Sequence, residues 1–388
     1  MKVARVALAL TLTCVAALYV AVGASQPWDF ETYYHAASAC RAHLDPYDLI
    51  ALSSVAGKPV ELPFLYPPVA LIPFLALSFL PLSAASLVWL GLKLGFLAGL
   101  LTMWRKTFLL GISGEAVLGV TLFGFNAAVL WDLRTGNVAI VEALLLWTGF
   151  LFYVRGRILR SACFIPAASV FKIMPIAFLG LLLVGPSATR KRVLAVVWGV
   201  ALLAGLLLAG WPLTMRWAVI LAHSIVGERQ KGEVNPSALG ILDGVLGDKH
   251  QALALTLFGL YACAIVLAAY PMLRRLRQRG SPEEWVIVAI TLWILLAPRV
   301  MIYSYVLMIV PALFAVRHAI TSPRMQALSY LVLMTQGLVR LLPGRPPAAL
   351  AEGPFLLTLA VFALLIARIG SVGSLRSPEP RIPLGGAG

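Results

Sequence analysis

Charged residues are scarce in this chain of 388 residues: they make up 12% of the sequence, whereas hydrophobic residues make up 61%. A soluble domain averages about one quarter charged residues and close to one half apolar residues. Apolar runs of about eighteen residues or more recur along the sequence, and such runs are typical of transmembrane helices. The composition therefore predicts an all-α polytopic integral membrane protein with about ten full transmembrane helices, supplemented by short re-entrant or half-length helices.

Acidic residues are the scarcer charge type, with 16 Asp and Glu against 31 Lys and Arg, which gives a formal net charge of +15. The basic residues form short clusters between the apolar runs rather than a stripe with interleaved aromatic residues, so no nucleic acid is expected as a partner. Such clusters mark cytoplasmic loops under the positive-inside rule. They lie at 155–160, 190–192, 274–279 and 368–381. Their spacing predicts that both termini are cytoplasmic.

Cysteine is also rare, and none of the four cysteines lies in a CxxC pair. Three fall in apolar runs, where a small buried thiol is expected, and the fourth, Cys40, has no obvious partner outside the membrane. The sequence contains no HExxH, P-loop or glycine-rich dinucleotide motif. We therefore expect no disulfide, no metal site and no cofactor.

A single transmembrane domain is predicted over residues 1–370, because no internal repeat and no separate soluble segment interrupts the apolar runs. The stretch 4–23 is expected to be an uncleaved anchor, since its apolar part is longer than a usual signal-peptide core. This places 25–65 in a first extracytoplasmic loop, and the same alternation places 211–250 in a second. Residues 371–388, rich in Ser, Pro and Gly, are expected to form a disordered cytoplasmic tail.

Two stretches are shorter than their flanks would require for crossing the membrane. Residues 66–81 begin with a Tyr-Pro-Pro sequence and are predicted to form a re-entrant or interfacial hairpin. Residues 158–185 have basic clusters at both ends and are expected to form two half-length helices that meet at Lys172 and Pro175. Backbone broken at that depth requires surrounding protein or a water-filled cavity. An external turn is expected at 132–137.

The first loop carries an unusual group of carboxylates, of which Asp29 lies about five residues beyond the first apolar span. A carboxylate at the membrane boundary can act as a general base for a hydroxyl when the other substrate is a lipid. The alternative is an interfacial carboxylate or the N-cap of a following surface helix. Asp29 is the candidate catalytic residue.

Three cations in later segments could bind a phosphate. Lys172 lies in the middle of an apolar run, where a lysine is costly and indicates function unless its ammonium snorkels to an interface. Arg299 follows Pro298 at the external end of a span, where it could bind phosphate bidentately or simply anchor the helix. Arg134 is a similar but less distinctive candidate. Glu142 is expected to pair with an arginine or to reach the surface.

These polar residues converge on one face of the membrane, with carboxylates from the first loop and cations from later turns. A cationic set beside a carboxylate suits a lipid-phosphate leaving group and an acceptor hydroxyl. A transporter more often places its ionisable residues near the midplane, between repeats. The arrangement favours an enzyme at the membrane surface, with a lipid-linked glycan flippase or other transporter, or a non-catalytic assembly subunit, as alternatives.

An ordered set of short motifs spans about residues 25 to 320. It comprises Asp29-Phe-x-x-Tyr33-Tyr34-x-Ala36-Ala37, Asp45-Pro46-Tyr47, Tyr66-Pro67-Pro68, Gly136-Asn137-Val138, Lys172-x-x-Pro175, Asn235-x-Ser237 and Pro298-Arg299. With these motifs the chain resembles glycosyltransferase family 87, polytopic enzymes of the GT-C type that include polyprenyl-phosphate-mannose-dependent α-mannosyltransferases.

The resemblance implies a GT-C-like fold, a polyprenyl-phosphate sugar donor, and catalysis at the extracytoplasmic, or periplasmic, side of the cell membrane, with Asp29 as the base. We expect inverting transfer of a hexose, with mannose as the expected sugar, to a lipid or glycan acceptor for cell-envelope synthesis. The donor phosphate would be bound by Lys172, Arg299 and Arg134. The substrate-binding residues are predicted to be Tyr33, Tyr34, His35, Tyr66, Asn137, Asn235 and Tyr303.

Overall fold

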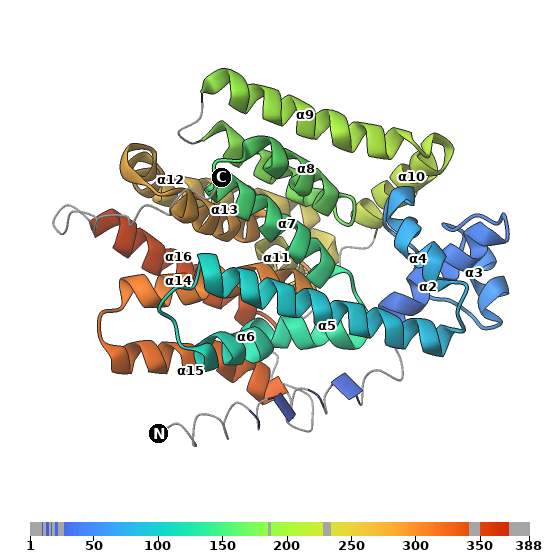
Figure 1. Ribbon diagram of the computed structural model, residues 1–388, viewed down its shortest axis with the longest axis horizontal. Helices are drawn as coiled ribbons and strands as arrows, with labels where there is room; N and C mark the ends of the chain where they lie inside the picture. Colours follow the sequence, from blue (N-terminus) through green and yellow to red (C-terminus); the bar gives the residue numbers. More distant parts are fainter. Residues whose placement is uncertain are drawn as a thin grey trace, which may run out of the picture.

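The computed structural model describes residues 27–184, 188–227, 234–340 and 350–371, together with positions 10, 13, 14, 17, 20 and 21 of the N-terminal segment. Within these ranges the chain is helical and contains no strand (Figure 1). The predicted all-α class is therefore confirmed over the described residues. The predicted tail, 371–388, lies outside them except for Ser371, and so does most of the predicted anchor.

Five helical segments are long and apolar enough to cross a membrane. They are α5 (Leu82–Thr107), α6 (Gly114–Thr135), α9 (Thr189–Leu208), the run Asp248–Arg279 that includes α12 (Gln251–Arg279), and the run Ile302–Ala319 that comprises η5 (Ile302–Met308) and α14 (Ile309–Ala319). The chain is a multi-pass membrane protein by this measure. The expected total of about ten full spans stays a prediction.

The described apolar helices that are shorter than a span include the predicted half-length pair. This pair consists of α8 (Ile158–Ser169) and η2 (Met174–Leu183), with Pro175 in the first turn of η2, where a missing N–H costs nothing. The predicted short element after Tyr66 is built from η1 (Pro68–Leu71) and α4 (Ile72–Leu77). Both stretches are therefore short helices, as expected from their lengths and prolines.

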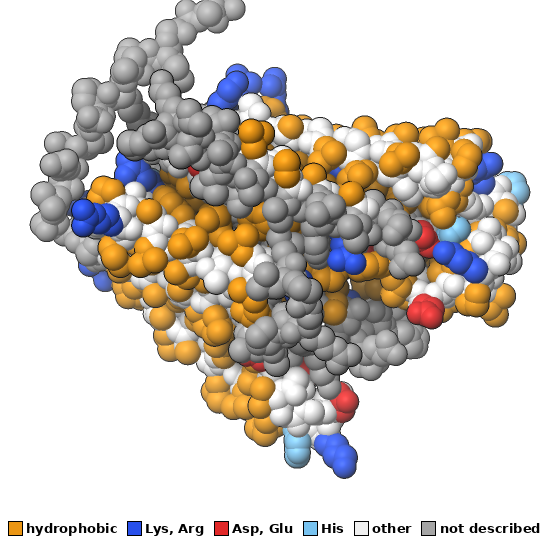
Figure 2. Space-filling model, turned by 90° about the horizontal axis from the view of Figure 1, so that it is seen from below, with side chains coloured by type: hydrophobic (Ala, Val, Ile, Leu, Met, Phe, Trp, Pro, Cys, Tyr) orange, Lys and Arg blue, Asp and Glu red, His pale blue; other side chains and the backbone are white. Residues whose placement is uncertain are grey.

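The centre of the bundle is formed by α6 and the run Ile302–Ala319, whose apolar windows are 83% and 72% buried. The corresponding windows of α9 and Asp248–Arg279 are only 17% buried, so these helices lie at the periphery. Around the centre pack α7 (Ala139–Val154), α13 (Pro282–Leu296), α15 (Pro323–Arg340) and α16 (Gly353–Ser371). Hydrophobic side chains cover much of the described face in Figure 2, and charged side chains lie mainly toward its edges.

The helix α6 is interrupted in its middle, although its sequence reads as one apolar span. Phe125, Asn126 and Ala127 all have left-handed φ angles, of 52°, 57° and 56°, which are unusual for residues with a side chain. The Asn126 side-chain amide donates to the carbonyl of Leu350, 2.7 Å away. The interruption therefore connects the span to the segment before α16.

The first predicted loop forms helices that gather at one end of the bundle (Figure 1). They are α2 (Trp28–Arg41), which has acidic residues in its first turn and Arg41 in its last, and α3 (Leu49–Ala56), capped by Asp48. An aromatic cluster that includes Phe30, Phe74 and Trp89 packs α2 against α4 and α5. This packing fixes the start of α2, where Asp29 lies.

Two predicted loops are more helical than expected. The second loop, 211–250, consists largely of α10 (Trp211–Gly227), α11 (Ala238–Leu246) and η4 (Asp248–His250). The turn expected at 132–137 is shorter, because α6 continues to Thr135 and Gly136 ends it in the left-handed conformation. Asp132 is therefore a buried residue of a helix and not part of an exposed turn.

Candidate functional site

The Asp29 carboxylate lies at the centre of a small hydrogen-bonded group. Asn137, in the link between α6 and α7, donates its side-chain amide to Asp29 Oδ2 at 3.0 Å and to the Tyr33 hydroxyl at 3.2 Å. The hydroxyls of Tyr33 and Tyr66 are 2.9 Å apart. The structure thus brings together four of the predicted site residues from three separate segments.

Gly136 allows this close approach between α2 and the α6–α7 link. Its φ is 75°, and a Cβ atom at this position would lie 2.5 Å from the Cβ of Phe30. Its carbonyl accepts a hydrogen bond from Trp89 Nε1 at 2.8 Å. A glycine is required here because both the backbone conformation and the contact with α2 exclude a side chain.

The orientation of the Asn137 side chain is fixed from both ends of the link. Its Oδ1 accepts the backbone N–H of Ala139 at 3.1 Å, in the first turn of α7. Its own backbone N–H is shared between the Asp132 carbonyl, 3.2 Å away, and the Thr135 hydroxyl, 3.3 Å away. The Nδ2 group is therefore directed at Asp29 and Tyr33.

Burial raises the pKa of the Asp29 carboxyl above its ordinary value. Hydrogen bonds from Asn137 and Thr135 lower it in part, the charge of Asp132 raises it, and the charge of Lys93 lowers it. Burial is the largest of these causes, so the carboxylate is a stronger base than an exposed one. A carboxylate of this kind is suited to taking a proton from a hydroxyl.

Lys172 lies in the link between α8 and η2 and has an anionic partner. Its ammonium is 2.9 Å from Glu142 Oε2 and donates to the Ser304 hydroxyl at 3.1 Å. It also lies 5.4 Å from the centre of the Tyr303 ring. Glu142 was expected to pair with an arginine or to reach the surface; instead it is buried and pairs with Lys172.

Arg299 lies in the link between α13 and η5 and is half-buried. Burial lowers the pKa of its guanidinium, while the neighbouring Tyr303 and Tyr66 raise it. An arginine remains charged through such a change, because its ordinary pKa is above about 12. Arg299 is therefore within electrostatic range of Tyr303 and Tyr66.

The link that carries Arg299 is held by the segment before α11. Asn235 Oδ1 accepts the backbone N–H of Val300 at 2.8 Å, and the Ser237 hydroxyl donates to the Pro298 carbonyl at 2.8 Å. Asn235 is buried, and its hydrogen bond with Val300 holds the link that carries Arg299. A direct contact of Asn235 with substrate stays a prediction.

Three other predicted residues have described contacts outside the Asp29 group. The Tyr34 hydroxyl donates to the Leu80 carbonyl at 2.8 Å, which ties α2 to the end of the α4 segment. His35 is buried and packs edge-on against Tyr34, and burial lowers its pKa. Arg134 lines a hollow of about 30 Å³ between α2 and α5, with Phe30 and Trp89. Their predicted roles in substrate and phosphate binding have no described contact in support.

Two charged residues that the sequence analysis did not select lie beside this site. Lys93 of α5 and Asp132 of α6 form an ion pair of 2.6 Å, and neither side chain has any exposed surface. Lys93 could have been found by the criterion that selected Lys172, since it also lies inside an apolar run. Among the described residues, no group of three His, Cys, Asp or Glu side chains could hold a metal ion.

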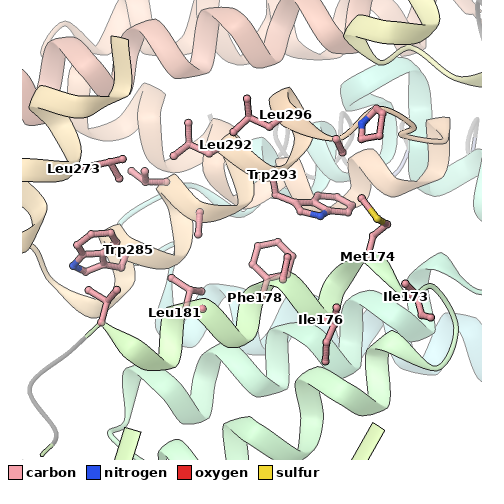
Figure 3. Close-up of a pocket in the computed structure, with 17 residues that line it drawn as sticks. Ile173, Met174, Ile176, Phe178, Leu181, Leu273, Trp285, Leu292, Trp293 and Leu296 are labelled. Carbon is pink, nitrogen blue, oxygen red and sulfur yellow. The ribbon is translucent and has the colours of Figure 1, made fainter. Parts of the chain in front are cut away.

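An apolar groove of about 520 Å³ runs between η2 and α13 (Figure 3). Met174 and Phe178 line it from η2, and Trp293 and Leu296 line it from α13. Ile173 and Pro298 also line it, and these are the immediate neighbours of Lys172 and Arg299 in the sequence. The two cations therefore lie beside one end of an apolar groove.

The model of glycosyltransferase family 87 matches residues 64–298, which include Tyr66, Asn137, Lys172 and Asn235. Asp29 precedes the matched segment, and Arg299 follows directly after it. No curated protein and no solved structure matches the chain.

Proposed function

The chain belongs to glycosyltransferase family 87 and is a membrane glycosyltransferase, and we propose that it transfers a hexose from a polyprenyl phosphate to an acceptor hydroxyl. The expected hexose is mannose, and the transfer inverts the configuration at the anomeric carbon. The reaction takes place at the extracytoplasmic face of the cell membrane and serves the synthesis of an envelope glycolipid or glycan. The observation that carries the proposal is the Asn137-held carboxylate of Asp29, which Tyr303 relates to both cations: Tyr303 interacts electrostatically with Asp29 and Arg299, and its ring lies beside Lys172. An apolar groove is lined by the sequence neighbours of the two cations.

Asp29 is the base in this reaction. The acceptor hydroxyl oxygen attacks the anomeric carbon and forms the new glycosidic bond, while the bond between that carbon and the phosphate oxygen breaks. The hydroxyl proton passes to Asp29, and the bonding electron pair leaves with the polyprenyl phosphate. The raised pKa of the Asp29 carboxyl supports this role, because a stronger base accepts the proton more readily.

Lys172 and Arg299 stabilise the departing phosphate. Negative charge on the leaving oxygen grows during the reaction, and fixed cations at that point stabilise the transition state more than the bound donor. The Ser304 hydroxyl accepts a hydrogen bond from the Lys172 ammonium and so helps to direct it. Arg299 is held in place through the backbone contacts of its link with Asn235 and Ser237.

The groove between η2 and α13 accommodates the first isoprenoid units of the donor. Its lining is almost entirely aliphatic and aromatic, and it begins beside both phosphate-binding cations. Because the donor tail is already in hydrocarbon within the bilayer, van der Waals packing against the lining, and not removal from water, would hold it in the groove. This arrangement supports a donor with a phosphate head and a long apolar tail, as opposed to a soluble nucleotide sugar.

The transfer assay compares wild type with Asp29→Asn in membranes at equal abundance, supplied with labelled polyprenyl-phosphate mannose and native lipid extract. Wild type should form a new labelled product, and Asp29→Asn should lose at least about a hundredfold in rate. The matched control is Asp48→Asn, the same change at the exposed N-cap of α3, where Asn is an equally good cap. The control should transfer at the wild-type rate.

Two results would contradict the proposal. Equal transfer by wild type and Asp29→Asn would remove Asp29 as the base. Movement of the labelled donor between the leaflets of a vesicle without a new glycoside would instead indicate a flippase. The anomeric configuration of the product, measured by NMR, tests inversion.

A further inference from the structure

Two side chains of α5 hold the link that carries Asn137. Trp89 Nε1 donates to the Gly136 carbonyl at 2.8 Å. One turn further along the same face of α5, the Lys93 ammonium forms an ion pair with Asp132 Oδ1 at 2.6 Å and also donates to the Asp132 carbonyl. The last turn of α6 and the start of the α6–α7 link are thus fastened to α5.

The Lys93–Asp132 pair is expensive to maintain for stability alone. Both side chains are fully buried, and both belong to helices long and apolar enough to span a membrane. The loss of hydration of two buried charges often exceeds their attraction, and a well-packed apolar pair would frequently be more stable. Ionisable residues within spans indicate function by default.

Asp132 uses nearly all of its acceptors to shape the link. Its Oδ2 accepts the backbone N–H of Ile140 at 3.3 Å, at the start of α7. Its carbonyl accepts the backbone N–H groups of Gly136 at 3.0 Å and Asn137 at 3.2 Å. The Lys93 ammonium binds both the side-chain carboxylate and the backbone carbonyl of Asp132. Through Asp132 it is connected to the end of α6, the link and the start of α7.

We propose that Lys93 and Asp132 are positioning residues for the transfer: their ion pair fixes the α6–α7 link so that Asn137 directs its amide at Asp29. The inference rests on the proposed function, since Asp29 is the base there. Neither residue lines the groove. Asp132 interacts with Lys172 only through its charge, whereas the hydrogen bonds of the pair run through the α6–α7 link to Asn137 and Asp29.

The two charges of the pair also act on Asp29, and their effects on its pKa have opposite directions. Asp132 raises the pKa of the Asp29 carboxyl and Lys93 lowers it, after the larger effects of burial and of the hydrogen bonds from Asn137 and Thr135. Removing only one partner would therefore disturb Asp29 electrostatically and leave an unpaired buried charge. A test must remove both charges together.

The variant for the test is Lys93→Met combined with Asp132→Asn. It removes both charges, leaves no buried ion unpaired and keeps a side-chain oxygen that can accept from Ile140. We expect it to insert and to retain its Tm, while kcat falls at least about tenfold and the donor KM stays within about twofold. Lys106→Met, the same lysine change at the exposed far end of α5, should leave kcat unchanged. A wild-type kcat in the double variant would overturn the proposal.

A second measurement needs no substrate and separates this inference from the proposed function. Asn137→Ala is introduced into wild type and into the Lys93→Met, Asp132→Asn background, and the four Tm values are compared in detergent. If the pair positions Asn137, the fall in Tm caused by Asn137→Ala is clearly smaller in the charge-free background. Equal falls would overturn the positioning role, even if the wild type proved to catalyse no transfer. Absence of transfer together with unequal falls would overturn only the proposed function.

Discussion

The Glu142 carboxylate lies 2.9 Å from the Lys172 ammonium, so the cation proposed to bind the donor phosphate already has an anionic partner. Only 3% of the Glu142 side chain is exposed, compared with 20% for Lys172, and the lysine is therefore the partner that a ligand can reach. A phosphate that binds here must share Lys172 with Glu142. We therefore expect the carboxylate to weaken the binding of both the proposed donor and its lipid-phosphate product.

Glu142→Gln tests this competition. Gln keeps an oxygen for Lys172 but removes the negative charge, so inhibition by the product polyprenyl phosphate should become roughly tenfold stronger, which corresponds to about 1.4 kcal/mol. The inhibition constant is measured in the transfer assay. Glu61→Gln, at an exposed position in the first loop, is the control and should leave it unchanged. Weaker product inhibition in Glu142→Gln would contradict the shared-cation interpretation.

The pH dependence of transfer should reflect the raised pKa of Asp29. Activity requires the carboxylate, so kcat/KM is high above this pKa and falls as the pH decreases through it. Because burial raises the pKa, the acidic limb should lie above the ordinary carboxyl value of about 4. Asn137→Ala removes a hydrogen bond that lowers the pKa, and should move the limb to still higher pH. A limb at about pH 4 in both proteins would refute this assignment.

Asp29 should also make the folded protein less stable at neutral pH. Its pKa is higher in the folded than in the unfolded state, so the free energy of unfolding decreases as the pH rises from about 4 through the raised pKa. Asp29→Asn removes this cost and can still accept from Asn137. Its Tm at pH 7.5 should exceed that of wild type, by about 2–4 °C for each kcal/mol gained. The difference should disappear below about pH 4, and a lower Tm for Asp29→Asn at pH 7.5 would contradict the prediction.

Gly136→Ala should disrupt the site through its backbone. The added Cβ would lie 2.5 Å from Phe30, and the φ of 75° strains any residue other than glycine, so we expect a loss of at least about 2 kcal/mol in stability. Thermal unfolding in detergent and the transfer assay should both show the loss. Gly91→Ala, in α5, meets no atom within 4 Å and should be neutral or stabilising. An unchanged Tm in Gly136→Ala would show that α2 can move away without cost.

Filling the groove should change the response to donor length. Ala289→Trp places a large side chain in the lining between η2 and α13, and should raise the KM for long-chain donors at least about tenfold. A donor whose lipid is a single isoprenoid unit should be affected much less. Leu267→Trp, at a position of α12 that is 73% exposed, is the control. An equal effect on short and long donors would indicate that the lipid lies elsewhere.

The sequence singles out Asp29 and Lys172 because ionisable residues in or beside apolar runs are costly, and their roles stay predictions. The same criterion applies to Lys93, but its role depends on Asp132, and their pairing depends on the packing of α5 against the end of α6. Glu142 was assigned the wrong kind of partner for a similar reason. Its pairing with Lys172 requires α8 and η2 to fold back along α7, which no local pattern specifies.

Two features were beyond any pattern in the sequence. Arg134 was grouped with the phosphate-binding cations by its position after a span, yet it lines a separate hollow near α5. Residues two positions apart on a helix do not share a face, so the position of Asp132 does not predict where the Arg134 side chain lies. The left-handed break at Phe125–Ala127 contains no proline, and only one glycine precedes it directly. It is held by tertiary contacts such as that between Asn126 and Leu350.

The two partners of Lys172 reach it at different times during translation. Glu142 lies on α7, before α8 and Lys172, so a partner for the lysine charge is already in the chain when Lys172 is inserted. Ser304 is 132 residues later in the chain and joins only after α13 has been synthesised. A ribosome-bound chain that ends before Arg299 contains both Glu142 and Lys172, but it lacks Arg299 and Ser304, so the proposed phosphate site would be incomplete. Under the proposed function, we therefore expect competence for transfer only late in biogenesis, well after Lys172 has been inserted.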